Sequence, residues 1–277
     1  MKTARPWKLN GTYRFDRDLL VYATYSEGFR VGGANPLKGS TMLAEDCTTP
    51  TTSKNYEVGA KTEWLEHRLR FNISAYYMKW DNFAVQIEDP QPEVFQLGYV
   101  NLASAEIRAS RLSSRQRSAG NGSSMARLRT TTRETSEAST FSATNEDGDT
   151  FDFQVEEGAR LPLSPEWSGA LGIEFRPSGL LFNAQPYFRF DYSYVGESVN
   201  SLEGIESVVS GRPVETQAAY QIGDLRFGLD GDHWSGSIFI NNLWDERADL
   251  FLSNRWGVQR QAINPPRTLG IQVRYTF

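Results

Sequence analysis

The sequence predicts an all-β protein: an antiparallel up-and-down transmembrane β-barrel, present in part, with about eleven strands. Runs of about ten residues alternate between apolar and polar side chains, which is the period of a strand with one apolar face. Short and long connections also alternate along the chain, as they do between the two ends of a membrane barrel. Finally, the polar positions of nearly every strand carry charged groups, as expected of a water-filled lumen.

Composition is compatible with this fold and excludes several others. The 277 residues have a mean hydropathy of -0.50, and no stretch approaches the roughly 18 apolar residues of a transmembrane helix. A barrel strand needs only one apolar residue in two. Aromatic residues make up 13% of the chain, which favours strands. The net charge of -5 argues against nucleic acid as a partner.

Cysteine usage and the N-terminal residues add two further expectations. Cys47 is the single cysteine, so the sequence allows no internal disulfide and no cysteine-based metal cluster. The first ten residues, MKTARPWKLN, contain no apolar core, so no signal peptide is expected in this chain.

The first half of the chain contains five stretches with strand periodicity. In the fourth, apolar side chains at odd positions from Leu69 to Tyr77 alternate with polar ones such as Arg70 and Asn72. The expected strands are 7–15, 19–30, 56–64, 69–77 and 99–108.

The second half resumes the same pattern after a break. The expected strands are 167–176, 182–194, 220–230, 234–240 and 266–277. Trp64, Trp167 and Trp234 fall on the apolar face near strand ends, where a barrel carries its interfacial aromatic belts. The opposite face carries Glu57, Lys61, Arg70, Glu174, Arg189, Asp191, Arg226 and Arg274.

The connections sort by length. Short ones are expected at 16–18, 65–67, 177–179 and 231–232, and long ones at about 31–53, 81–98, 198–215 and 242–265. This order predicts a meander in which each strand pairs antiparallel with the next. The first and last strands are then expected to remain open edges unless the partial barrel closes on itself.

The final strand is the most regular of all. Apolar side chains alternate with polar ones to the last residue, and the chain ends on an aromatic ring. This ending resembles the C-terminal strand of bacterial outer-membrane barrels, which the barrel-assembly machinery reads. The residues predicted to form that assembly signal are Leu269, Ile271, Val273, Tyr275 and Phe277.

Several stretches resemble the C-terminal part of TonB-dependent outer-membrane receptors. They are LLVYATYSEGFRVGGANP (19–36), YEVGAKTEW (56–64), LRFNISAYYMKWDNFAVQ (69–86), LPLSPEWSGALGIEF (161–175), SIFINNLWDERA (237–248) and PPRTLGIQVRYTF (265–277). The resemblance implies a 22-strand barrel closed by an N-terminal plug. It also implies uptake of siderophores, haem, cobalamin or glycans with energy from the TonB complex.

Residues 1–277 therefore correspond to the C-terminal half of such a barrel domain, without a plug. The resemblance implies location in the outer membrane of a Gram-negative cell, contact with its lipid, and a small-molecule ligand such as a ferric siderophore. The TonB complex is expected to act only on the full-length family member, so this chain alone is not expected to transport. No cofactor is implied.

Candidate catalytic and metal-binding residues are scarce. His67 and His233 lie in or beside short turns without a Ser, Cys or Asp arrangement that suggests a triad, so no enzyme activity is expected. The acidic run 146–152 lacks the ligand spacing and distal Glu of a calcium loop. Two alternatives remain open: another small outer-membrane barrel, either a pore or a lipase-like enzyme, and a soluble β-rich binding protein.

One segment, about 109–150, departs from the pattern. No aromatic residue lies between Tyr99 and Phe141, and arginines are dense there: Arg108, Arg111, Arg115, Arg117, Arg127, Arg129 and Arg133. Composition alone is typical of a basic disordered insert. We prefer a reading-frame shift, since a family-like strand GVEAELS can be encoded so that a one-nucleotide deletion yields Ala109–Arg115. The segment is expected to be poorly ordered or badly paired and to break the barrel wall.

Overall fold

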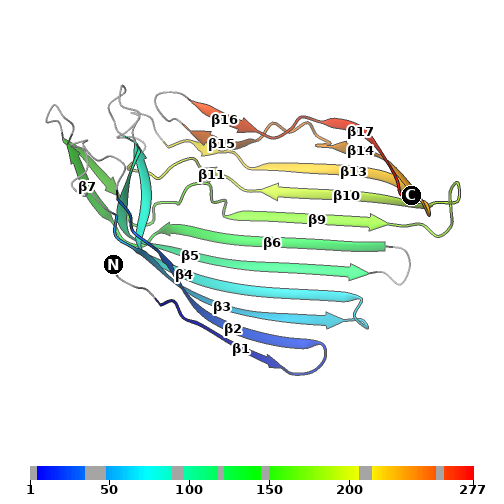
Figure 1. Cartoon of the computed structure of the whole chain (residues 1–277), viewed down its shortest axis with the longest axis horizontal. Coiled ribbons are helices and arrows are strands. Elements are labelled where there is room, and N and C mark those ends of the chain that lie inside the picture. The colour runs from blue at the N-terminus through cyan, green and yellow to red at the C-terminus, as the bar shows by residue number, and fades with distance from the viewer. Residues whose placement is uncertain are drawn as a thin grey trace.

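A computed structural model describes residues 5–34, 48–88, 97–117, 122–144, 150–205, 214–253 and 259–277. An eleven-stranded antiparallel sheet dominates it (Figure 1). Its strands are β1 (Lys8–Arg14), β2 (Leu19–Arg30), β3 (Thr51–Trp64), β4 (Leu69–Glu88), β5 (Leu97–Arg117), β6 (Gly122–Thr135), β9 (Trp167–Phe175), β10 (Gln185–Val195), β13 (Tyr220–Asp230), β14 (Trp234–Asn241) and β17 (Thr268–Tyr275).

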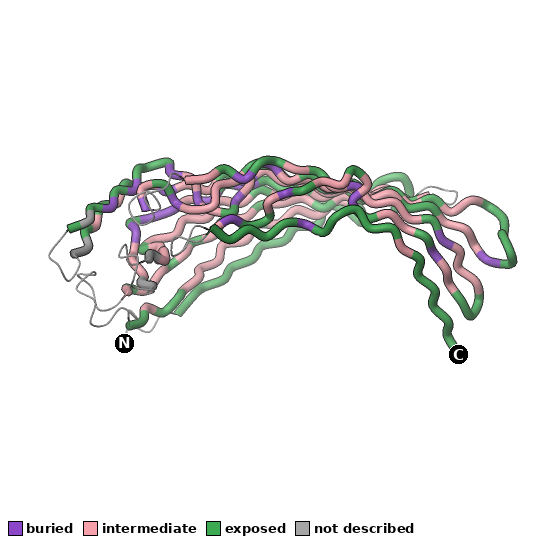
Figure 2. The backbone as a smooth tube through the Cα atoms, turned by 90° about the horizontal axis from the view of Figure 1, so that it is seen from above, coloured by how far each residue is buried: buried purple, intermediate pink, exposed green. Residues whose placement is uncertain are grey.

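The sheet is the predicted meander. Its order is β1-β2-β3-β4-β5-β6-β9-β10-β13-β14-β17, and every neighbouring pair is antiparallel. Within the described residues, β1 and β17 each pair on one side only, as expected of two open edges. Figure 2 shows the sheet bent into an arch, the shape of a section of barrel wall.

Three small hairpins interrupt the meander. All three lie at the end of the sheet that carries the long connections, opposite the short turns (Figure 1). They are β7 (Ser139–Thr144) with β8 (Thr150–Val155), β11 (Ser198–Val199) with β12 (Thr216–Gln217), and β15 (Asp249–Ser253) with β16 (Arg260–Ile263). Two of the expected long loops, 198–215 and 242–265, therefore contain regular structure of their own, and the β7–β8 hairpin lies outside the expected loops.

The prediction of a long loop at 81–98 is partly wrong. β4 continues to Glu88 and β5 begins at Leu97, so these residues pair well beyond the predicted strand ends. The strands extend because Phe83, Val85 and Val100 pack against a buried cluster at this end of the sheet. Residues 89–96 lie outside the described part of the chain.

For the described residues of the arginine-rich segment, the expectation of poor pairing is wrong. β5 runs to Arg117 and pairs along its length with β4, and β6 pairs on both sides, with β5 and β9. Leu112 lies opposite Ile73 and Leu128, in the row of apolar positions that the other strands continue. The wall is therefore continuous here. The reading-frame hypothesis itself stays a prediction, to be checked by translating the other two frames across codons 109–150.

The arginines are tolerated because they share one face. Six of them lie on the other face of the sheet from Leu112 and Leu128: Arg111, Arg115 and Arg117 of β5, and Arg127, Arg129 and Arg133 of β6. Only Arg108, opposite Tyr77, falls on the apolar side. The cost of about 2–4 kcal/mol for a lipid-facing arginine at mid-membrane therefore does not apply to those six.

Most of the densely packed core lies at the long-connection end rather than in the wall, as the purple segments of Figure 2 indicate. The ring of Phe153 stacks on that of Phe141 with centroids 4.6 Å apart. The cluster comprises Leu102, Ala105, Phe153, Val155, Ala159, Leu161, Leu202 and Ile205. Residues from β5, β8 and the segments after β8 and β11 thus hold the β7–β8 and β11–β12 hairpins onto the wall.

The tryptophans of the apolar face are exposed rather than buried. Trp64, Trp167 and Trp234 are 59%, 51% and 37% exposed. A soluble β-rich protein would need these side chains inside a closed core, so their exposure disfavours that alternative. Among the described residues, no helix is long and apolar enough to cross a membrane.

Candidate functional site

The outer face of the wall is a continuous apolar surface. The register aligns Ile271, Ile238, Phe227, Phe188 and Phe175 in one row across five strands. Each of these side chains is at least 42% exposed. Rows of exposed aliphatic and aromatic side chains across a curved sheet are what a lipid-facing barrel wall requires.

The inner face is charged, and three of its arginines, Arg70, Arg176 and Arg189, bind carboxylates. Arg176 donates to Glu174 at 2.8 Å and to Asp230 at 2.9 Å. Arg189 binds Asp191 with contacts of 2.6 and 2.9 Å. The charged residues that the sequence places at alternate positions thus form a network of ion pairs on one face of the sheet.

The residues of the predicted assembly signal lie together on the last strand. Leu269, Ile271 and Val273 of β17 stand opposite Ile240, Ile238 and Gly236 of β14, and Tyr275 stands opposite Trp234. Phe277 follows the strand, and its ring packs edge-on against Tyr275 with centroids 5.1 Å apart. All five are at least 60% exposed. Recognition by the assembly machinery stays a prediction.

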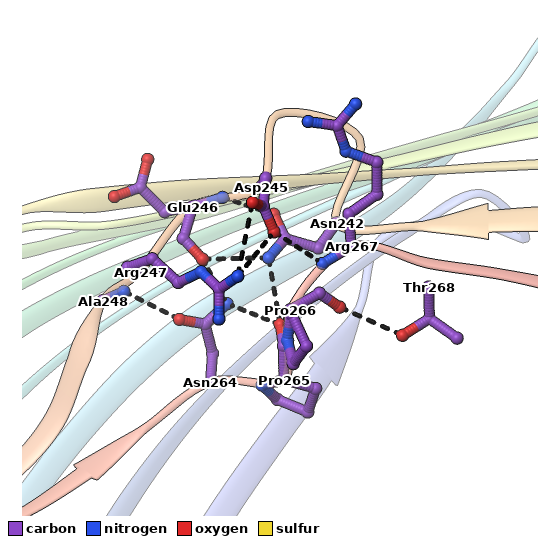
Figure 3. A network of polar contacts seen from close by, with 10 residues as sticks. All are labelled: Asn242, Asp245, Glu246, Arg247, Ala248, Asn264, Pro265, Pro266, Arg267 and Thr268. Atoms are coloured by element: carbon purple, nitrogen blue, oxygen red, sulfur yellow. Dashed lines mark hydrogen bonds and ion pairs between the residues drawn. The ribbon is translucent and has the colours of Figure 1, made fainter.

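A buried amide network fixes the chain where it enters β17 (Figure 3). Asn242 donates to the carbonyl oxygens of Glu246 and Pro265 at 2.9 and 3.0 Å, and its own side-chain oxygen accepts from the Glu246 amide. Asn264 donates to the same two carbonyls and accepts from the Ala248 amide at 2.7 Å. Both asparagines are at most 4% exposed. Sequence reasoning missed them because several partners are distant backbone groups: Pro265 is 23 residues from Asn242, and Glu246 is 18 residues from Asn264.

Replacing Asn242 with alanine is expected to lower the free energy of unfolding by at least about 2 kcal/mol, since each buried partner left unpaired costs roughly 1–3 kcal/mol. Asn242 also has φ 55°, which alanine tolerates poorly. Urea titration in detergent micelles measures the change. The neighbouring Asn241 is exposed and provides the control: Asn241→Ala should cost less than about 0.5 kcal/mol. Equal costs would contradict the role of the network.

Asp245 adds a pH-sensitive contact to the same corner. The backbone N–H of Arg267 donates to its carboxylate at 2.8 Å, and this bond, followed by the charge of Arg247, holds the pKa of Asp245 below its usual range. A carboxyl group whose pKa is lower in the folded than in the unfolded chain stabilises the folded state at any pH above its unfolded pKa. This stabilisation is lost as the pH falls through the folded pKa. Asp245→Asn should therefore be less stable than the parent chain at pH 7, and the difference should shrink as the pH falls through the folded pKa of Asp245.

Urea titrations of the parent chain and the variant, paired at each pH from 7 downward, measure the difference in their free energies of unfolding. The contributions of all other carboxylates are the same in both proteins and cancel in this difference. A difference that stays constant with pH would contradict the assignment to Asp245.

The histidines lie at the short-turn end. His67 follows two other residues with positive φ, Leu65 and Glu66, and its Nδ1 lies 2.5 Å from Glu63 Oε2 and 3.6 Å from Asp18 Oδ1. These three groups could approach a metal ion, and sequence spacing did not suggest it. The Glu63 carboxylate is already bound by Arg70 at 2.6 Å, so the arrangement is an ion-pair network at a turn. His233 lies in the turn before β14.

Two sequence features lie outside the described residues. They are Cys47 and the acidic residues Glu146 to Asp149. Asp152 of the same acidic run lies in β8, where it accepts a hydrogen bond of 2.7 Å from the Ser142 hydroxyl.

Comparisons with known proteins agree with this geometry. The family model described as TonB dependent receptor-like, beta-barrel, matches residues 7–243. The ferric-pyoverdine 358 receptor of Pseudomonas putida is 33% identical over 81 residues, which are 29% of this chain and 9% of that protein.

Two solved structures share the fold. The ferric yersiniabactin uptake receptor of Yersinia pestis superposes with a TM-score of 0.71 at 17% identity, over 98% of this chain and 37% of that one. The ferripyoverdine receptor of the outer membrane of Pseudomonas aeruginosa gives 0.64 at 16% identity, over 97% and 32%. The chain thus spans about a third of the length of each receptor. By its family match and its barrel-wall fold, the chain belongs to the TonB-dependent receptor family, as part of the β-barrel domain.

Proposed function

We propose that the chain is the C-terminal half of the barrel of an outer-membrane receptor that takes up a scarce nutrient. The nutrient that we favour is an iron–siderophore complex. The observation that carries this proposal is the superposition of nearly the whole chain on receptors whose names specify ferric yersiniabactin and ferripyoverdine. The hairpins at the long-connection end are the regions proposed to meet the ligand, since barrels of this kind expose their long loops to the exterior.

Location in the outer membrane follows from the same proposal. The apolar outer face would contact lipid. The barrel-assembly machinery would recognise the apolar side chains at the end of the chain, which are Leu269, Ile271, Val273, Tyr275 and Phe277. The protein is proposed not to be an enzyme. In support, His67 and His233 lie at the end proposed to be periplasmic, away from the external face where a lipase would need its histidine.

Uptake is proposed for the complete receptor and not for these 277 residues alone. Eleven strands enclose no lumen while β1 and β17 remain open edges in the described sheet. Energy coupling in the family acts through a plug segment, which the resemblance does not place in this chain. Titration of the chain with the C-terminal domain of TonB should accordingly give no binding, and saturable binding would contradict the proposal.

The test of the uptake function is transport of radioactive iron. A Gram-negative strain without siderophore receptors would receive either the complete receptor containing this barrel segment or the 277-residue chain. Iron-55 offered as ferripyoverdine and as ferric yersiniabactin should enter with the complete receptor and not with the chain. A complete receptor that reaches the outer membrane but transports neither complex would overturn the assignment to these siderophores.

A further inference from the structure

An unusual cluster of positive charge lies on the inner face of β5 and β6. It consists of Arg111, Arg115, Arg127 and Arg129, which we call the inner arginine cluster. Arg111 and Arg129 are direct cross-strand partners, while Arg127 stands opposite Ser113 and Arg115 opposite Met125. Directly opposite residues have Cα atoms about 4.5–5.5 Å apart, and like charges in that position repel.

The cluster differs from the other arginines of the inner face. Arg70, Arg176 and Arg189 each bind a carboxylate at 2.6 to 2.9 Å. Within the part of the chain that the structure describes, no carboxylate comes within 4.0 Å of the guanidinium groups of the cluster. The charge of the cluster is therefore not balanced by an ion pair there.

Neutral groups position Arg129 without neutralising its charge. Arg129 donates to the Tyr76 hydroxyl at 3.0 Å and to the Thr131 hydroxyl at 2.9 Å. The side chains of Arg111, Arg115 and Arg127 are exposed. Arg129 is thus held by two strands, and the other three guanidinium groups are accessible from the lumen side.

The charged groups on the neighbouring strands do not cancel the field. Arg70 of β4 is the cross-strand partner of Arg115 and adds a further positive group, and its carboxylate Glu63 is shared with His67. On the other side, Glu174 of β9 stands opposite Ser123 and is bound by Arg176. Glu63 and Glu174 are therefore already engaged with other cations. Glu57 of β3, opposite Tyr76, accepts a hydrogen bond of 2.7 Å from the Tyr22 hydroxyl and forms no ion pair with the cluster.

We propose that the inner arginine cluster is a binding site for a small, multiply charged oxyanion of the polycarboxylate or polyphosphate class. Guanidinium groups bind carboxylate and phosphate with paired, charge-assisted hydrogen bonds. Arg127 and Arg129 are two positions apart on one strand, about 7 Å, and Arg111 lies across from Arg129. A patch of this size matches two or three anionic groups on one compact molecule. This inference goes beyond the proposed uptake function and holds whether or not the molecule carries iron.

The test is titration calorimetry on the 277-residue chain folded in zwitterionic detergent, with citrate and pyrophosphate as probes and acetate as the monovalent comparison. The two probes distinguish a carboxylate site from a phosphate site. The double variant Arg111→Gln/Arg129→Gln should bind the preferred probe at least about tenfold more weakly. The matched control Arg176→Gln/Arg189→Gln removes the same charge from arginines that already have carboxylate partners, and should change the affinity less than about twofold.

Three results would overturn the proposal. Neither probe binds the parent chain; both double variants lose affinity equally, which indicates a diffuse field; or a hexaglutamate peptide binds far more tightly than either probe, which indicates a polypeptide partner. If the glutamine variant fails to fold, Arg111→Lys/Arg129→Lys keeps the charge and removes the paired donors. It should still weaken binding, and unchanged affinity in that variant would also overturn the proposal.

Discussion

Replacing Phe153 with alanine is expected to destabilise the β7–β8 hairpin by about 3–5 kcal/mol, the usual cost of removing a buried aromatic side chain. Phe153 is fully buried, stacks on Phe141 and belongs to the cluster that joins the β7–β8 hairpin to β5. The loss should appear as local opening, because the wall strands do not depend on this cluster for their own pairing.

Hydrogen exchange of the β7–β8 backbone amides measures that opening. Protection should fall in the hairpin and persist in β9 and β10. Phe251→Ala is the matched control, since Phe251 lies in the β15–β16 hairpin but is 42% exposed, and its cost should stay below about 1 kcal/mol. Unchanged protection in the Phe153 variant would contradict the buried cluster.

Replacing Leu171 with arginine is also expected to destabilise the protein strongly. Leu171 lies on β9 opposite Ala126 and Tyr192, on the apolar parity of the wall. A lipid-facing arginine near mid-membrane should lower the free energy of unfolding by about 2–4 kcal/mol, because the guanidinium group leaves water for hydrocarbon. Urea titration of the chain in phospholipid vesicles measures the loss.

Ser193→Arg is the matched control for the direction of the face. Ser193 stands opposite Ala170 and so lies close to the level of Leu171, but on the inner side of the sheet. An arginine there faces water and should cost less than about 1 kcal/mol. If both arginines cost the same, the outer face is not in contact with lipid.

Ten strands of the wall were predictable because each repeats the two-residue alternation over several positions. The final strand is the clearest case, with Leu269 to Tyr275 paired as expected. The strand β6 was missed because its outward positions carry small and hydroxyl side chains, such as Ser124, Ala126 and Thr130, instead of aromatic ones. A usable signal was present: six of the seven arginines share odd positions, which places them on one face within each strand, and the register of β5 with β6 makes it the same face.

Contacts between distant segments were not predictable from periodicity. The packing of Phe153 near Leu102 depends on how the β7–β8 hairpin folds back over the sheet. Likewise, Asn242 binds the Pro265 carbonyl and Asn264 binds the Glu246 carbonyl, and only the finished fold brings these groups near. Their sequence neighbours carry no pattern that identifies those partners, whereas wall strands are defined by local alternation alone.

β6 is an ordinary wall strand whose arginines face the lumen. Spin labels placed singly at positions 123–130, with Cys47 replaced by serine, test this directly in phospholipid vesicles. Labels at 124, 126 and 128 should be accessible to oxygen dissolved in lipid, and labels at 125, 127 and 129 to a nickel chelate in water. Uniform accessibility to the nickel chelate, without a period of two, would show instead that this segment is a solvated basic insert.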